Sequence, residues 1–148
     1  MSKSNNFEND LLLLLFNNTA IANIGNTAGL QPSGVPGSFY VALSTGTLDD
    51  THTAEQTETA YAPYARVAVA RSTAGWTVTT NSVSPTADID FAECTATPGA
   101  ALTYFCITPG ATATTADDII YYGTLTPNIT MATGVIPRIK STSTITED

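Results

Sequence analysis

Charged residues are scarce in this chain, and basic residues are the scarcest of all. Charged side chains make up only 12% of the 148 residues, whereas an ordinary soluble domain has roughly 25%. Lys and Arg number 5 against 13 Asp and Glu, which gives a formal net charge of −8. Binding to a phosphate backbone or to an anionic membrane needs clustered cations. We therefore expect neither nucleic acid nor a membrane among the partners.

Cysteine and histidine are also few, and this limits the available chemistry. Cys94 and Cys106 do not form a C-x-x-C pair, so we expect no zinc or other metal. If the two cysteines lie on adjacent strands, they could form a disulfide. The simpler alternative is that both are buried as small apolar side chains. The only histidine, His52, lies in a polar threonine-rich loop, and no G-x-S-x-G motif is present. We expect a protein that is not an enzyme and holds no cofactor.

No apolar run is long enough to cross a membrane. Leu11–Leu15 with Phe16 is too short for a span, and the acidic Glu8 and Asp10 precede it instead of a basic segment. We expect a cytoplasmic product without a targeting segment. The run instead predicts a helix over 7–16.

The predicted helix starts after a cap at Asn5 or Asn6 and ends at Asn17-Asn18. A helix this short and apolar all round is unstable alone, so it must pack on the sheet, on a partner chain, or on both. The expected interface residues in it are Phe7, Leu11, Leu12, Leu15 and Phe16. Residues 17–37 are rich in Gly and Pro and predict a long loop, with one helical turn near 19–24. Such loops are usually functional or ordered by a partner.

From residue 38 onward the pattern is that of short strands. In Trp76–Phe91, apolar residues fall mostly on alternate positions, and the segment is broken in the middle by a turn with Pro85. The other predicted strands lie at 39–44, 64–71, 102–108, 119–125, 128–131, 135–140 and 142–146. We predict an all-β fold, a β-sandwich or jelly roll of about eight short antiparallel strands with one N-terminal helix. A single domain spans 1–148, with the helix and extended loop in 1–37 and the sandwich in 38–148.

Several polar residues have a functional and a structural interpretation. Asp88, Asp90 and Glu93 could offer oxygens to Ca²⁺, and the simpler interpretation is a solvated strand face. The acidic pairs at 49–50 and 117–118 are best explained as solvated turns. The tyrosines could form a platform for sugar, although core and interface packing explains most of them; they are Tyr40, Tyr61, Tyr64, Tyr104, Tyr121 and Tyr122.

Two arginines lie within predicted strands. Arg66 and Arg138 should each pair with an acid, either within the chain or across a subunit boundary. We expect at least one of them to act at an interface.

The ordered segments of the chain resemble a family of small virion proteins of tailed phages, usually labelled tail-fibre proteins. The matching segments are FENDLLLLLF, FYVALST, YARVAVA, a Trp followed by TNSVSPTADIDFAE, LTYFCI, IIYYGTLTPNI and GVIPRIKSTSTIT. They cover nearly the whole chain, and their order and spacing carry the resemblance. It implies a structural protein of the virion with a β-sandwich, assembled in the host bacterial cytoplasm.

Within that resemblance we expect capsid-surface decoration, in which the protein acts as a cement that stabilises the head. The sequence shows no fibrous repeat and no coiled-coil shaft. The partners would be copies of itself, with a trimer suited to three-fold sites, and the major capsid protein or another virion protein. The alternative is a tail-fibre, neck or baseplate component that binds a host receptor or another tail protein.

Overall fold

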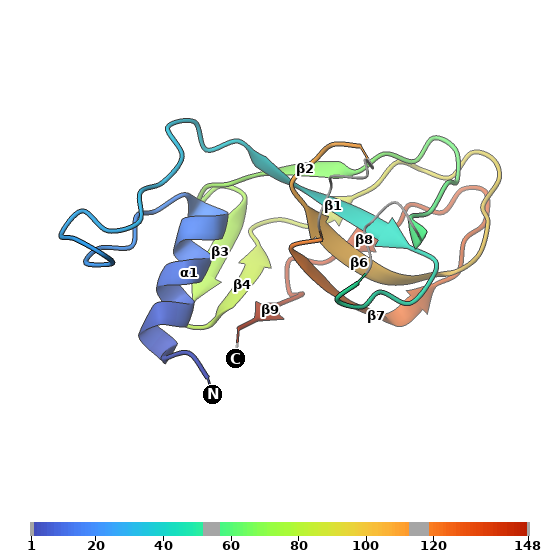
Figure 1. Ribbon diagram of the computed structural model, residues 1–148. Helices are drawn as coiled ribbons and strands as arrows, with labels where there is room; N and C mark the ends of the chain where they lie inside the picture. The colour runs from blue at the N-terminus through green and yellow to red at the C-terminus, as the bar shows by residue number, and fades with distance from the viewer. Residues whose placement is uncertain (1, 52–56, 113–118, 148) are drawn as a thin grey trace. The chain divides into compact units, whose positions relative to one another are not determined.

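The computed structural model describes residues 2–51, 57–112 and 119–147. Within these ranges it contains one helix and nine strands (Figure 1). The elements are α1 (Asn5–Asn17), β1 (Ser38–Ser44), β2 (Val67–Ala70), β3 (Trp76–Thr79), β4 (Ser82–Pro85), β5 (Ile89–Asp90), β6 (Leu102–Thr108), β7 (Tyr121–Ile129), β8 (Arg138–Ile139) and β9 (Ile145–Thr146). The predicted all-β class with antiparallel strands and one N-terminal helix is confirmed.

Contacts between residues divide the chain into two compact units. Unit 1 comprises Met1–Ser38, Val69–Asp88 and Lys140–Asp148, and unit 2 comprises Phe39–Ala68 and Ile89–Ile139. Each unit is described by itself below. The expectation of a single domain over 1–148 and that of a jelly-roll strand order stay predictions. No helix among the described residues has the length and apolar character needed to cross a membrane.

Unit 1 is organised around α1, which packs on β3 and β4 (Figure 1). The predicted cap at Asn5 or Asn6 is wrong, because Ser4 caps the helix by accepting a hydrogen bond from the Phe7 N–H at 3.4 Å. The helix ends as predicted, at Asn18 in the left-handed conformation. Its inner face buries Leu12 and Phe16 completely.

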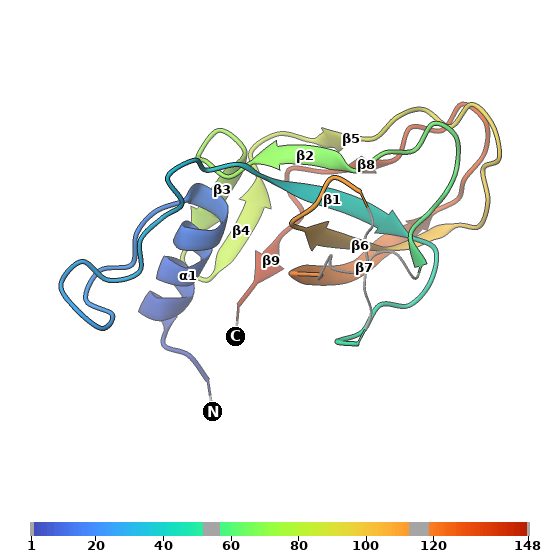
Figure 2. The same cartoon turned by 45° about the horizontal axis from the view of Figure 1, so that its top comes forward.

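The hairpin of β3 and β4 corrects the prediction for Trp76–Phe91. The turn lies at Thr80 and Asn81, not around Pro85, and 82–85 form a strand that the pattern did not predict. Pro85 is tolerated because it is the last residue of β4, opposite Trp76. Strand β9 adds to the other edge of β4, so that a three-stranded sheet results (Figure 2).

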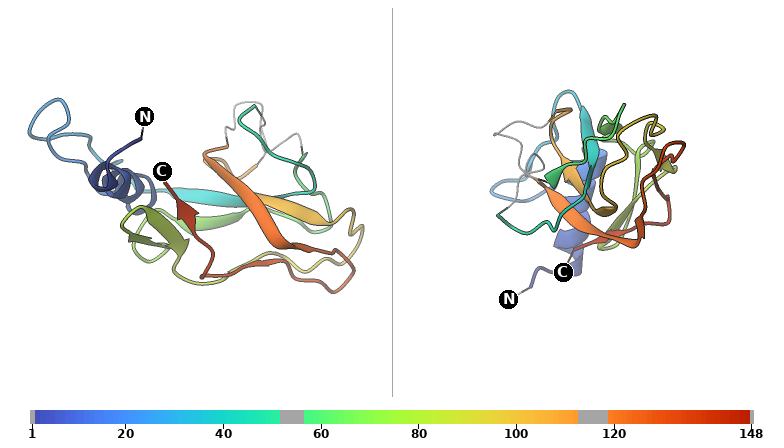
Figure 3. Two further views of the ribbon diagram at one scale, coloured as in Figure 1. Left: turned by 90° about the horizontal axis from the view of Figure 1, so that it is seen from below. Right: turned by 90° about the vertical axis from the view of Figure 1, so that its right-hand side faces the viewer.

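Unit 2 contains a four-stranded sheet in the order β2-β1-β6-β7 (Figures 2 and 3). Alternate residues of β1 and β6 face opposite sides. On one face Val41, Leu43 and Ile107 are buried, and on the other Ala42 and Cys106 form a cluster with Leu48. Strands β5 and β8 form a separate antiparallel pair.

Two predicted strands at the C-terminal side of the chain form a single element. The ranges 119–125 and 128–131 are replaced by β7, which runs through Thr126 and Pro127 to Ile129. A central strand could not contain Pro127, but β7 is at the edge of the sheet. Gly123 leaves room for the ring of Phe105, its cross-strand partner, since a Cβ atom at residue 123 would lie 2.8 Å from the Phe105 Cε1 atom.

Candidate functional site

Residues 18–37 form an ordered projection from the end of α1, which we call the arm. At its base the Asn18 side-chain amide donates to the Ser33 carbonyl at 2.8 Å and accepts from the Ser33 N–H at 2.9 Å. Further out, Ile21 and Leu30 exchange two backbone hydrogen bonds of 3.0 and 2.8 Å. The expected helical turn near 19–24 is therefore wrong, because this stretch pairs with the returning half of the arm. Figures 1 and 3 show the arm reaching beyond α1.

Arg71 holds the arm to the helix. Its guanidinium donates to the carbonyls of Leu15 at 2.6 Å, Leu14 at 3.0 Å and Pro36 at 3.0 Å. The last carbonyls of a helix have no partner within the helix, so Arg71 satisfies groups that would otherwise need water. Sequence analysis did not single out Arg71, although a cation beside a helix C-terminus is the expected partner for these carbonyls.

The arm leaves several apolar side chains uncovered within unit 1. Val35 is 82% exposed, Leu30 is 44% exposed and Ile24 is 36% exposed, while Ile21 is buried. Residues 17–37 contain no charged side chain. An ordered, uncharged segment with exposed aliphatic groups has the composition of a contact surface.

The five predicted interface residues of α1 lie on different faces. Leu12 and Phe16 are buried inside unit 1, where the Phe16 ring meets Trp76 edge to face at 4.8 Å. Leu11 and Leu15 are half-buried, and Phe7 is 36% exposed. The outer face of α1 thus keeps apolar surface next to the arm.

Arg66 belongs to a buried polar network in unit 2. Its guanidinium binds both carboxylate oxygens of Glu58 at 2.9 Å, and it donates to the Thr108 hydroxyl at 3.1 Å and the Gly110 carbonyl at 2.8 Å. The Tyr64 hydroxyl donates to Glu58 at 2.7 Å. The arginine was expected to pair with an acid, and here the acid comes from the same chain.

Arg138 also pairs within the chain, but near solvent. Its guanidinium binds Asp90, with one contact of 2.9 Å, and about half of each side chain remains exposed, 51% and 49%. Asp88 accepts from the Ser141 N–H at 2.8 Å. Asp88 and Asp90 therefore make contacts within the chain, and the described residues contain no group of three potential metal ligands. His52 and the pair 117–118 lie outside the described residues.

The tyrosines do not form one platform. Tyr61 is buried, and its ring contacts Tyr64 at 5.3 Å. Tyr122 is 40% exposed and donates to Asp50 at 2.8 Å. Tyr104 and Tyr64 line two different hollows, Tyr104 the groove described below and Tyr64 a hollow beside Glu58 and Arg66. Packing inside the chain thus explains Tyr61 and Tyr64, as the structural interpretation predicts, and the alternative of a shared sugar platform does not fit this arrangement.

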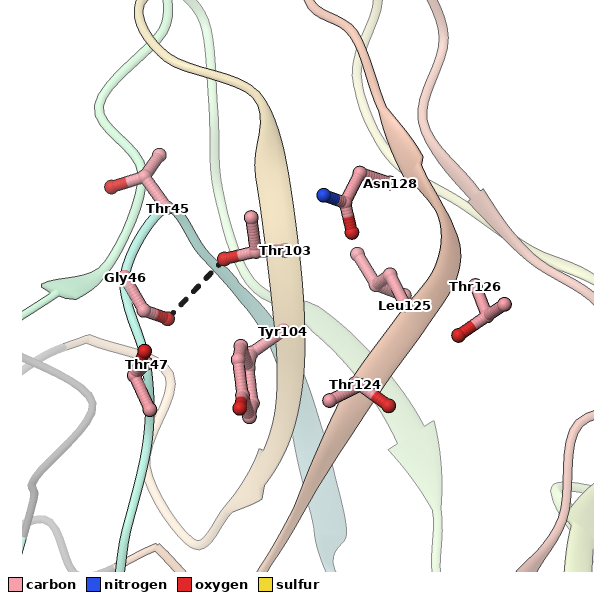
Figure 4. A pocket seen from close by; sticks show the side chains of 9 residues that line it. All are labelled: Thr45, Gly46, Thr47, Thr103, Tyr104, Thr124, Leu125, Thr126 and Asn128. Atoms are coloured by element: carbon pink, nitrogen blue, oxygen red, sulfur yellow. Dashed lines mark hydrogen bonds between the residues drawn. The ribbon is translucent and has the colours of Figure 1, made fainter.

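A polar groove of about 500 Å³ lies where β7 leaves the sheet of unit 2 (Figure 4). We call it the groove, and its lining residues are Thr45, Gly46, Thr47, Thr103, Tyr104, Thr124, Leu125, Thr126 and Asn128. The groove arises from a register shift. Leu102 pairs with Ile129 while Tyr104 pairs with Thr124, so the four residues from 125 to 128 oppose Thr103 alone. The extra residues bend β7 away from β6.

Burial and nearby acids raise several pKa values in unit 2. Burial, with Glu58 as a second cause, raises the pKa of the Cys106 thiol to about 12. Burial likewise raises the pKa of Tyr61 to about 12 and raises that of Tyr64 further. Cys94 and Cys106 are both free and buried, as the simpler of the two alternatives predicts. With these raised pKa values, Cys106, Tyr61 and Tyr64 stay protonated at neutral pH and are not suited to act as bases.

Comparison with known families defines the class of the protein. The chain is a structural protein of a phage virion. It belongs to the family described as Podophage GP4 fiber I protein gp80, whose pattern matches residues 2–146. The resemblance to tail-fibre-type virion proteins is thereby confirmed. No curated protein matches the chain significantly.

Proposed function

We propose that the chain is a building unit of a podophage tail fibre and assembles with other copies through the arm and the outer face of α1. The fibre assignment follows the family, which favours the alternative considered above over capsid decoration. The observation that carries the assembly surface is the ordered, uncharged arm with its exposed aliphatic side chains.

The arm is suited to docking because its conformation is already fixed before a partner binds. Asn18, Arg71 and the pairing of Ile21 with Leu30 hold it. Gly29 contributes, since a Cβ atom there would lie 1.8 Å from the Ile21 carbonyl oxygen. A preformed surface loses little conformational entropy on association.

The occupant we propose is a second copy of this chain. With a net charge of −8, two copies repel each other wherever their acidic residues meet. The twenty-one residues 17–37 carry none of these charges, and neither do Leu11–Phe16 beside them. Copies can therefore approach through the arm and residues 11–16 without unpaired charge being buried, whereas Glu8 and Asp10 follow Phe7 at the start of the helix.

The predicted interface residues take different roles in this proposal. Phe7, Leu11 and Leu15 would contact the partner, whereas Leu12 and Phe16 would act indirectly by holding α1 on its sheet. The two arginines belong to unit 2, where each pairs with an acid of that unit, and we assign neither of them to the surface proposed in unit 1.

The test introduces a charge at the most exposed apolar residue of the arm. Val35→Asp should raise the dissociation constant of self-association at least tenfold in sedimentation velocity experiments, because an unpaired carboxylate would be buried at the contact. Ile136→Asp is the matched control, since Ile136 is 52% exposed and belongs to unit 2. Equal effects of the two substitutions would overturn the arm as the assembly surface.

The position in the virion needs a separate measurement. Purified protein would be added to phage particles that lack it and located by electron microscopy. Density on the tail supports the fibre proposal, and regular density over the head lattice would establish decoration instead.

A further inference from the structure

We propose that the groove binds an uncharged saccharide. This inference rests on the proposed fibre function, in which a surface of the chain meets the host, and it assigns the contact to the groove. The groove combines hydroxyl groups, one carboxamide, one aromatic ring and one aliphatic side chain, and none of its nine lining residues is charged.

The polar groups of the groove are available to a ligand. The Thr103 hydroxyl donates to the Gly46 carbonyl at 3.3 Å (Figure 4). The Thr45 hydroxyl donates to the Thr57 carbonyl at 3.4 Å, so these two threonines hold residues 45 and 46 at the side of the groove. Among the described residues, the side chains of Thr47, Thr124, Thr126 and Asn128 have no hydrogen-bond partner. Threonine hydroxyls and a carboxamide both donate and accept, which matches the hydroxyl groups of a sugar.

Tyr104 supplies the apolar part of the contact. Its ring packs against the buried cluster of Ala42, Leu48 and Cys106 and is therefore held in place. The ring lies in the groove between Thr47 and Thr124 (Figure 4). A fixed aromatic ring with a polar tip offers one face to the C–H groups of a sugar ring and its hydroxyl to the rim. Leu125 adds a second apolar contact.

The size and charge of the groove narrow the class of ligand. Its volume of about 500 Å³ falls within the range of roughly 300–1,000 Å³ found for small-ligand sites. Phosphate and carboxylate groups would find no cation among the lining residues, and the chain carries a net charge of −8. Acidic saccharides are therefore disfavoured relative to uncharged ones.

A peptide is the other macromolecule that could dock at the edge of a sheet. Strand addition needs a regular row of backbone donors and acceptors. Here the row is interrupted where residues 125–128 bend away, and Pro127 has no N–H to donate. The groove itself is mainly polar, so the observations favour a saccharide over an added strand.

The test uses the full chain labelled with ¹⁵N and a panel of uncharged oligosaccharides built from glucose, galactose or rhamnose. Sialylated and uronic-acid oligosaccharides serve as acidic probes, and a peptide with the sequence of β7 serves as the strand probe. We expect saturable amide shifts at 45–47, 103–104, 124–126 and 128 with at least one uncharged oligosaccharide, and weaker or no binding of the acidic probes and the peptide.

Variants connect the shifts to the groove. Thr126→Ala with Asn128→Ala should weaken binding about tenfold, because the loss of two hydrogen bonds amounts to roughly 1.4 kcal/mol, which corresponds to a factor of 10. Thr79→Ala with Asn6→Ala is the matched control in unit 1 and should leave the affinity unchanged. Tyr104→Phe keeps the ring and should weaken binding less than the double variant.

The proposal is overturned if no uncharged oligosaccharide binds, if the acidic probes or the peptide bind more tightly, or if the control weakens binding as much as the groove variant. Self-association of the same samples would be measured in parallel. If the chain self-associates but binds no sugar, only the proposal for the groove is refuted. If Val35→Asp abolishes self-association and sugar binding is retained, the two surfaces act independently.

Discussion

The ion pair of Arg66 with Glu58 should stabilise unit 2 far more than that of Arg138 with Asp90. Both pairs involve two guanidinium nitrogens and two carboxylate oxygens, but they differ in burial. The side chains of Arg66 and Glu58 are 1% and 12% exposed, whereas those of Arg138 and Asp90 are 51% and 49% exposed. The comparison therefore isolates the effect of the surroundings.

The magnitude follows from what each substitution leaves behind. Glu58→Ala leaves a buried guanidinium without its counter-charge, and the removal of one partner of a buried pair costs about 3–5 kcal/mol. It also leaves the Tyr64 hydroxyl without its acceptor. Asp90→Ala releases Arg138 into water, and an exposed pair contributes about 0–1 kcal/mol. Arg66→Met with Glu58→Leu removes both charges and should recover most of the stability lost in Glu58→Ala.

The assay is urea unfolding of the full chain followed by far-UV circular dichroism, together with amide exchange of β1 and β6. Tryptophan fluorescence is unsuitable, because Trp76 belongs to unit 1. Glu58→Ala and Asp90→Ala should differ by at least about 2 kcal/mol in the free energy of unfolding. If both substitutions lowered the free energy of unfolding by less than about 1 kcal/mol, the reasoning would be refuted. Such a result would mean that the guanidinium group of Arg66 is hydrated as easily as that of Arg138 once its acid is removed.

Two further predictions concern unit 1 and the pH dependence of unit 2. Phe16→Ala should cost about 3–5 kcal/mol and shift the fluorescence of Trp76 to longer wavelength, because a fully buried ring is lost beside the indole; an unshifted spectrum would contradict this packing. Stability should fall as the pH rises from about 9 to 12, because Cys106 and Tyr61 ionise at lower pH in the unfolded chain than in the folded one. Cys106→Ala should flatten this dependence, and an unchanged slope would contradict the assigned cause.

The elements that sequence predicted well are those rich in apolar residues. Strands β1 and β6 are apolar through most of their length, are buried on both faces and appear within one residue of their predicted bounds. The helix was evident from its leucines and its terminal asparagines. Strand β4 was missed, because its pattern SVSP has only one large apolar residue and ends in proline. Residues 82–85 form a strand because they pair with β3 and β9, and not because their own strand propensity is high.

The candidate surfaces were only partly predictable. The apolar helix and the uncharged loop after it indicated a contact surface, but the exposure of Val35 depends on the fold of the arm. The groove could not be predicted, because it results from a register shift between β6 and β7 that no local pattern encodes. Arg71 was overlooked for a similar reason, since its acceptors Leu14 and Leu15 lie far from it in the sequence.

The distribution of cations explains why an acidic chain can still be an assembly protein. Four of the five basic residues make their contacts inside the chain; they are Lys3, Arg66, Arg71 and Arg138. Cations that hold together the chain's own parts are not available to attract a partner. In the two proposals made above, recognition by the arm and by the groove would therefore depend on shape, apolar contact and hydroxyl hydrogen bonds. Long-range attraction, which salt would screen, contributes little to contacts of this kind.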